Sequence, residues 1–260
     1  MALIRNYFFS ETLQINTSMT IIFPQLQQVN LKMNQLIEKH GFPTLYLLHG
    51  LFDDDITWIR RTSIERYVDS LGLAVVMPQV GRSYYTDMVY GPKYWTFLSE
   101  EVPKITRTFF RLSDKREYNF VAGVSMGGYG ALKWALSRPK QFMAVASLSG
   151  RIDIAKLSED PLRVRDYKLI FDNQTVEDTE NDLFWLLKNF NQNKSPKPKV
   201  YISCGIEDDL YGENLMFCDA LQDAAFDCTF DEGLGGHEWS YWDQKIQDVL
   251  DWLVYHFLIP

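Results

Sequence analysis

Short apolar runs alternate with longer amphipathic segments along most of the chain. A short run of apolar or alternating residues that ends in proline, glycine or a polar turn is typical of a strand in a sheet. The strands predicted on this pattern cover residues 3–9, 19–23, 44–48, 74–77, 119–122, 143–148, 199–205 and 228–230.

Helices are predicted between most of these strands, where apolar residues recur every three or four positions. The predicted helices are residues 62–70, 94–110, 130–136, 213–224 and 241–257, whereas residues 25–39 are polar and ambiguous. Pro103 must either kink the helix over residues 94–110 or lie in a first turn. Alternating strands and helices form parallel strand pairs joined by crossovers. We therefore expect an α/β fold with a central, mostly parallel sheet and helices on both faces.

Residues 151–194 interrupt the alternation. They are mixed and charged, contain no clear strand, and hold one apolar patch at residues 183–187. A surface excursion and a small cap or lid over a binding site both fit this composition. No internal repeat or linker divides the chain, so we expect a single domain over residues 1–260, with 151–194 as a cap-like insertion.

Composition and charge narrow the classes of function. The chain has 260 residues, of which 46% are hydrophobic and 23% charged, as expected of a globular protein. A formal net charge of −8 disfavours nucleic acid as a partner. There is no apolar stretch long enough to cross a bilayer and no signal peptide at the start. We expect a cytoplasmic protein without a membrane partner, either a monomer or a homo-oligomer.

Residues 119–136 carry the clearest chemical signal. An apolar run leads into Gly-Val-Ser-Met-Gly at residues 123–127, and good helix formers follow. This is the strand–turn–helix context of a G-x-S-x-G nucleophile elbow, in which a sharp turn leaves room only for glycine beside the nucleophile. Ser125 is therefore the predicted nucleophile, held above the positive end of the following helix.

A serine hydroxyl needs a base that accepts its proton, and the base needs an orienting acid. His237 follows a glycine-rich stretch on a loop, where an imidazole is freely presented, whereas His49 closes a buried strand. The acid is sought among Glu207, Asp208 and Asp209, which follow a strand at the edge where α/β sheets place catalytic loops. The chain order of serine, acid and histidine is that of α/β-hydrolases.

Acyl transfer also needs donors for the negative charge that develops on the carbonyl oxygen, and one donor is worth roughly 3–4 kcal/mol. The backbone N–H of Met126 is one candidate because this residue follows the nucleophile. The second is expected from the loop after strand 44–48, where the N–H of Leu51 is best placed.

Motifs for other chemistries do not fit the sequence. Residues 123–128 have the spacing of a P-loop, but Tyr129 stands where lysine is required. His237 lacks a second histidine four residues later, and the three cysteines form no C-x-x-C pair, so neither pattern predicts a metal site. An acyltransferase with the same three side chains, or a binding module on the same scaffold, stays open.

The motifs taken together resemble the esterase D family, which contains S-formylglutathione hydrolases, tributyrin esterases, feruloyl esterases and mycolyltransferases. The matching stretches are residues 46–50, 75–78, 85–87, 123–130, 204–208 and 236–239. The resemblance extends along nearly the whole chain and is strongest to the tributyrin-esterase branch. It implies an α/β-hydrolase fold and activity without a metal or organic cofactor.

The resemblance also implies roles for individual residues. These are Ser125 as nucleophile, Asp208 rather than Asp209 as acid, His237 as base, and Leu51 and Met126 as oxyanion donors. S-formylglutathione hydrolases of the family usually have histidine before the nucleophile, where this chain has Val124. The expected function is a serine carboxylesterase for short acyl esters, acetyl to butyryl, such as tributyrin or acetylated sugars. Hydrolysis of S-formylglutathione and acyl transfer are the alternatives.

Aromatic side chains are expected to line the substrate pocket, because they make up 15% of the chain and several lie near the predicted loops. The candidates are Trp58, Tyr84, Tyr85, Trp185 and Trp239. The acidic run Asp53, Asp54 and Asp55 follows the oxyanion loop and would disfavour anionic substrates if it lies near the pocket mouth, although such a run is usually a solvated face. Neutral, small-molecule esters are therefore the expected substrates.

Overall fold

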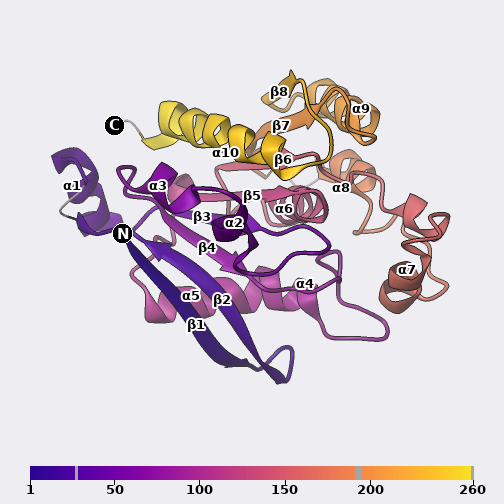
Figure 1. Ribbon diagram of the computed structural model, residues 1–260, viewed down its shortest axis with the longest axis horizontal. Helices are drawn as coiled ribbons and strands as arrows, with labels where there is room; N and C mark the ends of the chain where they lie inside the picture. Colours follow the sequence, from indigo (N-terminus) through magenta and orange to yellow (C-terminus); the bar gives the residue numbers. More distant parts are fainter. Residues whose placement is uncertain (27–28, 191–194, 259–260) are drawn as a thin grey trace.

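An eight-stranded sheet forms the centre of the protein (Figure 1). The computed structural model describes residues 1–26, 29–190 and 195–258. The strands are β1 Ala2–Ser10, β2 Ile15–Phe23, β3 Thr44–Leu48, β4 Ala74–Pro78, β5 Asn119–Val124, β6 Ala144–Leu148, β7 Lys199–Gly205 and β8 Cys228–Gly233. Their order in the sheet is β1-β2-β4-β3-β5-β6-β7-β8. The first two are antiparallel to their neighbours, and the others run parallel.

Helices and short turns connect these strands. The helices are α1 Leu31–His40, α2 Thr57–Arg61, α3 Ile64–Val68, α4 Tyr94–Thr96, α5 Val102–Phe109, α6 Met126–Ser137, α7 Val164–Phe171, α8 Leu183–Phe190, α9 Tyr211–Asp223 and α10 Trp239–Leu253. The π turns are η2 Phe97–Glu101 and η6 Val254–Leu258, and the three-ten turns are η3 Arg116–Tyr118 and η4 Ala155–Ser158.

Helices cover both faces of the sheet. Tyr46 of β3 packs against Trp134 of α6, with ring centroids 5.1 Å apart. Tyr201 of β7 packs against Trp252 of α10, with ring centroids 5.4 Å apart. The strand register aligns Tyr46 with Val200, the neighbour of Tyr201, so the two tyrosines point to opposite faces. The central strands β3, β4, β5 and β6 are buried on both sides, which explains their continuous apolar runs.

The predicted α/β architecture is confirmed, and each predicted strand is present with ends that differ by at most four residues. The predicted helix over residues 94–110 is interrupted, as Pro103 indicated. It is divided into α4, η2 and α5, and Pro103 lies in the first turn of α5. Proline has no amide proton to donate, so it is tolerated where a helix begins and disfavoured inside one.

Helices α1, α2, α3 and α10 also differ from the prediction. The helix expected over residues 62–70 is reduced to α3, and α2 before it was not predicted. The ambiguous segment 25–39 contains α1, and residues 27–28 of this segment lie outside the described part. The Asn30 side chain caps α1 by accepting a hydrogen bond from the Met33 N–H. The last helix begins at Trp239, earlier than expected, and ends in η6.

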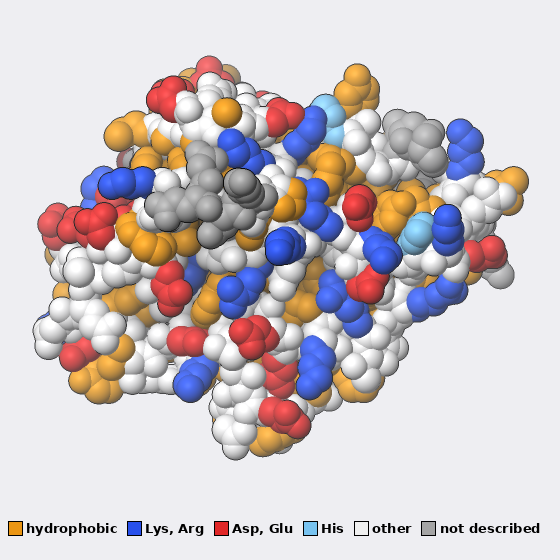
Figure 2. Space-filling model, turned by 180° about the vertical axis from the view of Figure 1, so that it is seen from behind, with side chains coloured by type: hydrophobic (Ala, Val, Ile, Leu, Met, Phe, Trp, Pro, Cys, Tyr) orange, Lys and Arg blue, Asp and Glu red, His pale blue; other side chains and the backbone are white. Residues whose placement is uncertain are grey.

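Residues 151–190 form the excursion that the sequence indicated, whereas 191–194 lie outside the described residues. This part contains η4, α7 and α8, and no strand is found in it. It projects beyond the sheet beside α6, at the right of Figure 1. On the face seen in Figure 2, acidic and basic side chains are interspersed among small apolar areas. Of the helices that the structure describes, none has the length and hydropathy of a membrane span.

Candidate active site

The turn between β5 and α6 holds Ser125 in a strained conformation. Its φ of 56° and ψ of −115° lie in a region that non-glycine residues rarely adopt. A Cβ on Gly123 would lie 2.2 Å from the carbonyl oxygen of Gly127, and one on Gly127 would lie 2.5 Å from that of Leu48. Both glycines are therefore required by the close approach of α6 to β5 and β3.

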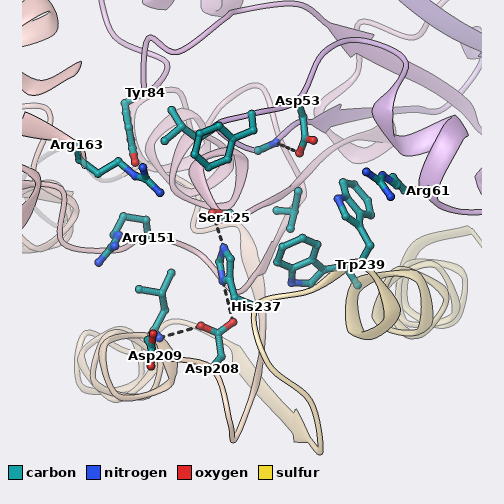
Figure 3. A pocket seen from close by; sticks show the side chains of 16 residues that line it. Asp53, Arg61, Tyr84, Ser125, Arg151, Arg163, Asp208, Asp209, His237 and Trp239 are labelled. Atoms are coloured by element: carbon teal, nitrogen blue, oxygen red, sulfur yellow. Dashed lines mark hydrogen bonds and ion pairs between the residues drawn. The ribbon is translucent and has the colours of Figure 1, made fainter. Parts of the chain in front are cut away.

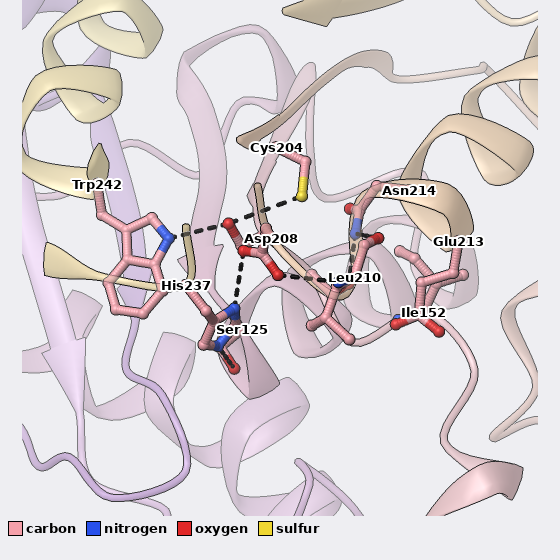
Figure 4. Close-up of polar contacts among 11 residues, drawn as sticks. Ser125, Ile152, Cys204, Asp208, Leu210, Glu213, Asn214, His237 and Trp242 are labelled. Atoms are coloured by element: carbon pink, nitrogen blue, oxygen red, sulfur yellow. Dashed lines mark hydrogen bonds and ion pairs between the residues drawn. The ribbon is translucent and has the colours of Figure 1, made fainter. Parts of the chain in front are cut away.

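Three side chains from distant parts of the sequence meet at this turn (Figure 4). The Nε2 atom of His237 lies 2.9 Å from the Oγ of Ser125. Its Nδ1 atom lies 2.9 Å from the Oδ2 of Asp208. Ser125 follows β5, Asp208 follows β7, and His237 lies between β8 and α10, so the parallel sheet brings their carboxyl-terminal loops together. This is the geometry of a nucleophile, a base and an orienting acid.

Only one of the three candidate carboxylates contacts His237. The side chain of Asp208 is inaccessible to solvent, and its Oδ1 accepts a hydrogen bond from the Leu210 N–H at 2.9 Å. Burial by itself raises the pKa of Asp208, but hydrogen bonds, led by that with His237, bring the pKa below its usual value. Asp209 is exposed, and Glu207 accepts from the Gly235 N–H instead.

The loop after β3 is held by the buried imidazole of His49. Its Nε2 accepts from the Val80 N–H at 3.2 Å, so Nδ1 carries the proton and donates to the Gly50 carbonyl at 2.7 Å. Burial lowers the pKa of His49, which keeps the ring neutral. The C=O and N–H of one peptide unit point in opposite directions. Because the Gly50 carbonyl points to His49, the N–H of Leu51 points away from that ring.

The two predicted oxyanion donors differ in their position relative to the cavity. Leu51 lines the cavity beside Ser125. Met126 follows Ser125 as the first residue of α6, so its N–H has no acceptor within the helix. Their role as oxyanion donors stays a prediction.

A cavity of about 520 Å³ opens over Ser125 and His237 (Figure 3). Of the five aromatic residues expected in its wall, Tyr84 and Trp239 line it. The prediction is wrong for Trp58 and Tyr85, which are buried in the core. Their polar atoms donate to the carbonyl oxygens of Leu48 and His49, respectively.

Trp185 also lies away from the cavity, half-buried on α8 and packed against the core. The lining contains side chains that the sequence did not single out, namely Phe52, Arg61, Arg151, Arg163, Leu210 and Trp242. They come from separate loops and helices, and no local motif marks them.

The acidic run is mostly turned away from the cavity. Asp53 lines it and accepts from the Gly50 N–H at 3.2 Å. Asp54 instead accepts from the Ile56 N–H at the start of α2. Asp55 is buried and accepts from the hydroxyl of Thr20 at 2.8 Å. Of the three carboxylates, only Asp53 therefore lies where it could affect a bound substrate.

Residues 28–253 match the family model described as "Putative esterase". The chain belongs to this esterase family. The acetyl esterase of Caldicellulosiruptor saccharolyticus is 30% identical to the protein, over 97% of this chain and 98% of that one. These similarities confirm the predicted family and the prediction of a carboxylic ester hydrolase.

Two solved structures from Staphylococcus aureus resemble this esterase along almost its whole length. FphF, a fluorophosphonate-binding serine hydrolase, superimposes with a TM-score of 0.89 at 37% identity, over 97% of this chain and 98% of that one. The S-formylglutathione hydrolase FrmB superimposes with a TM-score of 0.86 at 37% identity and the same coverage. The esterase is accordingly a serine hydrolase with the α/β-hydrolase fold.

Proposed function

We propose that this esterase hydrolyses short-chain acyl esters through an acyl-enzyme formed on Ser125. The observation that carries the proposal is the continuous line of hydrogen bonds from Asp208 through His237 to the Ser125 hydroxyl, which faces an open cavity. A base in contact with a strained, half-buried serine that lines a cavity has the arrangement that nucleophilic catalysis requires.

In the first step, the Ser125 Oγ attacks the ester carbonyl while His237 Nε2 accepts its proton. Asp208 fixes the tautomer of the imidazole and stabilises the imidazolium that forms. The N–H groups of Leu51 and Met126 stabilise the oxyanion, and His237 returns the proton to the departing alcohol.

In the second step, His237 removes a proton from water, which attacks the acyl-enzyme carbonyl. Collapse of the second tetrahedral intermediate breaks the bond to the Ser125 Oγ, and His237 reprotonates that oxygen as the carboxylic acid leaves. Every proton transfer uses one imidazole nitrogen, so the hydrogen bond between His237 and Ser125 serves both halves of the reaction.

Acyl groups from acetyl to butyryl fit the apolar part of the cavity, to which Leu51, Phe52 and Trp239 contribute. The similarity to an acetyl esterase over nearly the whole chain supports this size. The similarity to FrmB supports S-formylglutathione as an alternative substrate, although Val124 precedes the nucleophile. Transfer of the acyl group to an alcohol by the same residues is the other alternative.

Hydrolysis of p-nitrophenyl acetate, butyrate and octanoate, beside tributyrin and S-formylglutathione, tests the proposal. We expect kcat/KM to be highest for the acetyl or butyryl esters and Ser125→Ala to lower kcat by about 10⁴-fold or more. Faster turnover of S-formylglutathione than of every oxygen ester would favour the thioester alternative. If the ratio of new ester to free acid rises with the concentration of added alcohol, acyl transfer is favoured over hydrolysis.

A further inference from the structure

One side of the cavity is built from two arginines and a tyrosine. Figure 3 shows Arg151, Arg163 and Tyr84 on one side of Ser125, with Arg61 on the other. All of them line the cavity. We call Arg151, Arg163 and Tyr84 the arginine wall.

The two guanidinium groups of the wall are not neutralised by a carboxylate. Among the described residues, the ion pairs include neither Arg151 nor Arg163. By contrast, the nearby Arg82 is bound to Asp166 at 2.6 Å. Arg163 lies over the ring of Phe52, 4.9 Å from its centroid, which positions the charge without cancelling it.

The carboxylates around the wall are few and otherwise engaged. Asp208 is hydrogen-bonded to His237, and Asp53 accepts from the Gly50 N–H; burial raises the pKa of Asp53 more than His49 and Arg61 lower it. Glu213 is near Arg151, but it lies outside the cavity lining and accepts from a backbone N–H at 3.1 Å. Burial raises the pKa of Glu213 more than Arg151 lowers it. Asp209 is the remaining carboxylate on this side, and it is exposed.

Tyr84 supplies a neutral donor near the two arginines. Burial raises its pKa to about 12, and Arg151 and Arg163 lower it in part, which places both guanidinium groups near the phenol. The hydroxyl therefore stays protonated at neutral pH. Two guanidinium groups and a hydroxyl provide several N–H and O–H donors, the set that binds a carboxylate most strongly.

The arginine wall is close enough to Ser125 for one small ester to contact both. The backbone N–H of Arg151 donates to the carbonyl oxygen of Ser125 at 3.2 Å, so the residue is in contact with the nucleophile's own backbone. An ester whose carbonyl carbon is at the Ser125 Oγ extends its acyl chain or its alcohol across the same cavity.

We propose that the arginine wall binds a carboxylate of the substrate, so that the preferred substrates are short esters whose acyl or alcohol part carries a carboxylate. This proposal rests on the proposed function and narrows its substrate class. It differs from the expectation of neutral esters, which depended on the acidic run lying near the pocket mouth, where only Asp53 is found.

Two isosteric substrate pairs test the proposal and separate the acyl side from the alcohol side. Monoethyl succinate and ethyl succinamate differ only by a carboxylate or amide on the acyl side. The compounds 4-acetoxybenzoate and 4-acetoxybenzamide differ in the same way on the alcohol side. For at least one pair, we expect the ratio of kcat/KM, anionic over neutral, to fall about tenfold or more in Arg151→Met/Arg163→Met.

The matched control is Arg165→Met, which removes the same charge from an exposed position on α7 outside the cavity. It should leave both ratios unchanged. The wild-type ratio should also fall as NaCl is raised from about 0.05 to 0.5 M, because salt screens the attraction between charges. Ratios that are the same in the wild type and the double variant for both pairs would overturn the proposal.

Failure of the proposed function gives a different result. If the wild type hydrolyses none of these esters, including the neutral ones, the esterase proposal fails for this substrate size. Calorimetry with Ser125→Ala then tests the wall alone, through binding of 4-acetoxybenzoate and 4-acetoxybenzamide. If Ser125→Ala binds 4-acetoxybenzoate more tightly than 4-acetoxybenzamide, and Ser125→Ala/Arg151→Met/Arg163→Met does not, the proposed role of the wall is supported. Equal binding of the two compounds by Ser125→Ala overturns it.

Discussion

At the residue scale, two adjacent carboxylates differ in their contact with the imidazole of His237, and only Asp208 is placed to orient it. Asp208 is buried against the ring, whereas Asp209 is exposed in the cavity. We expect Asp208→Asn to lower kcat for p-nitrophenyl acetate by on the order of 10⁴-fold, because the amide favours the wrong tautomer. Asp209→Asn serves as the matched control and should change kcat only a few-fold. Equal losses in the two variants would exclude Asp208 as the orienting acid.

His49 has a positioning role that can be measured separately. Its ring fixes the Gly50 carbonyl and thereby the direction of the Leu51 N–H. We expect His49→Phe to lower kcat for p-nitrophenyl acetate by about 10²-fold, as does removal of an oxyanion donor, with a smaller change in KM. His256→Gln, at an exposed position on η6, is the control. A large rise in KM with unchanged kcat would contradict this role.

At this scale, the predicted residues that the structure brings together lie in segments with a local sequence signature. Ser125 lies in a glycine motif whose spacing is set by backbone contacts, and His237 follows a glycine-rich loop. Arg151 and Arg163 have no such signature, because neither lies in a recognisable motif and only the folded chain brings them to the same side of the cavity. Trp58 and Tyr85 are predicted in the pocket because they lie on segments near the predicted loops. Sequence position cannot show that a side chain turns into the core.

At the element scale, the position of α6 depends on glycines that allow it to approach β3. A Cβ on Gly127 would meet the backbone of Leu48 and His49 at 2.5 and 2.7 Å, whereas one on Gly212 in α9 would meet nothing within 4 Å. We expect Gly127→Ala to lower the free energy of unfolding in urea by about 3 kcal/mol or more, through strain. Gly212→Ala should leave it unchanged or raise it by about 0.5–1 kcal/mol. Similar values for both variants would contradict this explanation.

Lys133 joins α6 to two neighbouring loops from a buried position. Its Nζ donates to the Tyr85 carbonyl at 3.1 Å and to Asn181 Oδ1 at 2.7 Å. Burial lowers the pKa of Lys133 to about 7, against the opposing influence of Glu180 and Asp87. A lysine in the unfolded chain has a pKa of about 10.4. Between these values the unfolded state binds more protons, so the free energy of unfolding gains up to about 1.4 kcal/mol per pH unit.

Lys133→Met should therefore flatten the dependence of stability on pH between about 7 and 10. Urea unfolding at several pH values in this window measures the slope for the wild type and the variant. Below the folded-state pKa, both states are protonated and the two slopes should converge. Parallel curves across the window would show that Lys133 does not lose its proton in the folded protein.

The elements themselves were predictable to the extent that one feature determines them. Buried strands were found because a strand covered on both faces must be apolar throughout. Pro103 indicated the break before α5, whereas the π turn η2 was missed because such a turn keeps helical periodicity nearly intact. Helix α2 was missed because its packing against the core determines it. α1 has a polar surface with only Met33 and Ile37 buried, too few to mark a helix.

At the scale of the whole molecule, positive charge is gathered on one side of the cavity although the chain as a whole is acidic. The chain has a formal net charge of −8, yet Arg151 and Arg163 stand on the same side of the cavity. The lining also includes the carboxylates of Asp53, Asp208 and Asp209, so the positive charge belongs to the arginine wall and not to the cavity as a whole. Net charge disfavours polyanionic partners and does not determine which small substrate one side of the cavity attracts.

The excursion over residues 151–190 connects this scale to the site, because it carries both arginines of the wall. We propose that it is a cap of the cavity within a single domain over residues 1–260. A cytoplasmic location and a homo-oligomeric state stay predictions from the sequence.

The most direct test of the catalytic centre is the site and rate of covalent labelling by a fluorophosphonate probe, read by mass spectrometry of peptides. One adduct on Ser125 is expected. Labelling should be much slower in His237→Ala and absent in Ser125→Ala, since the imidazole activates that hydroxyl. An adduct on another residue, or equal labelling rates with and without His237, would contradict the proposed nucleophile and base.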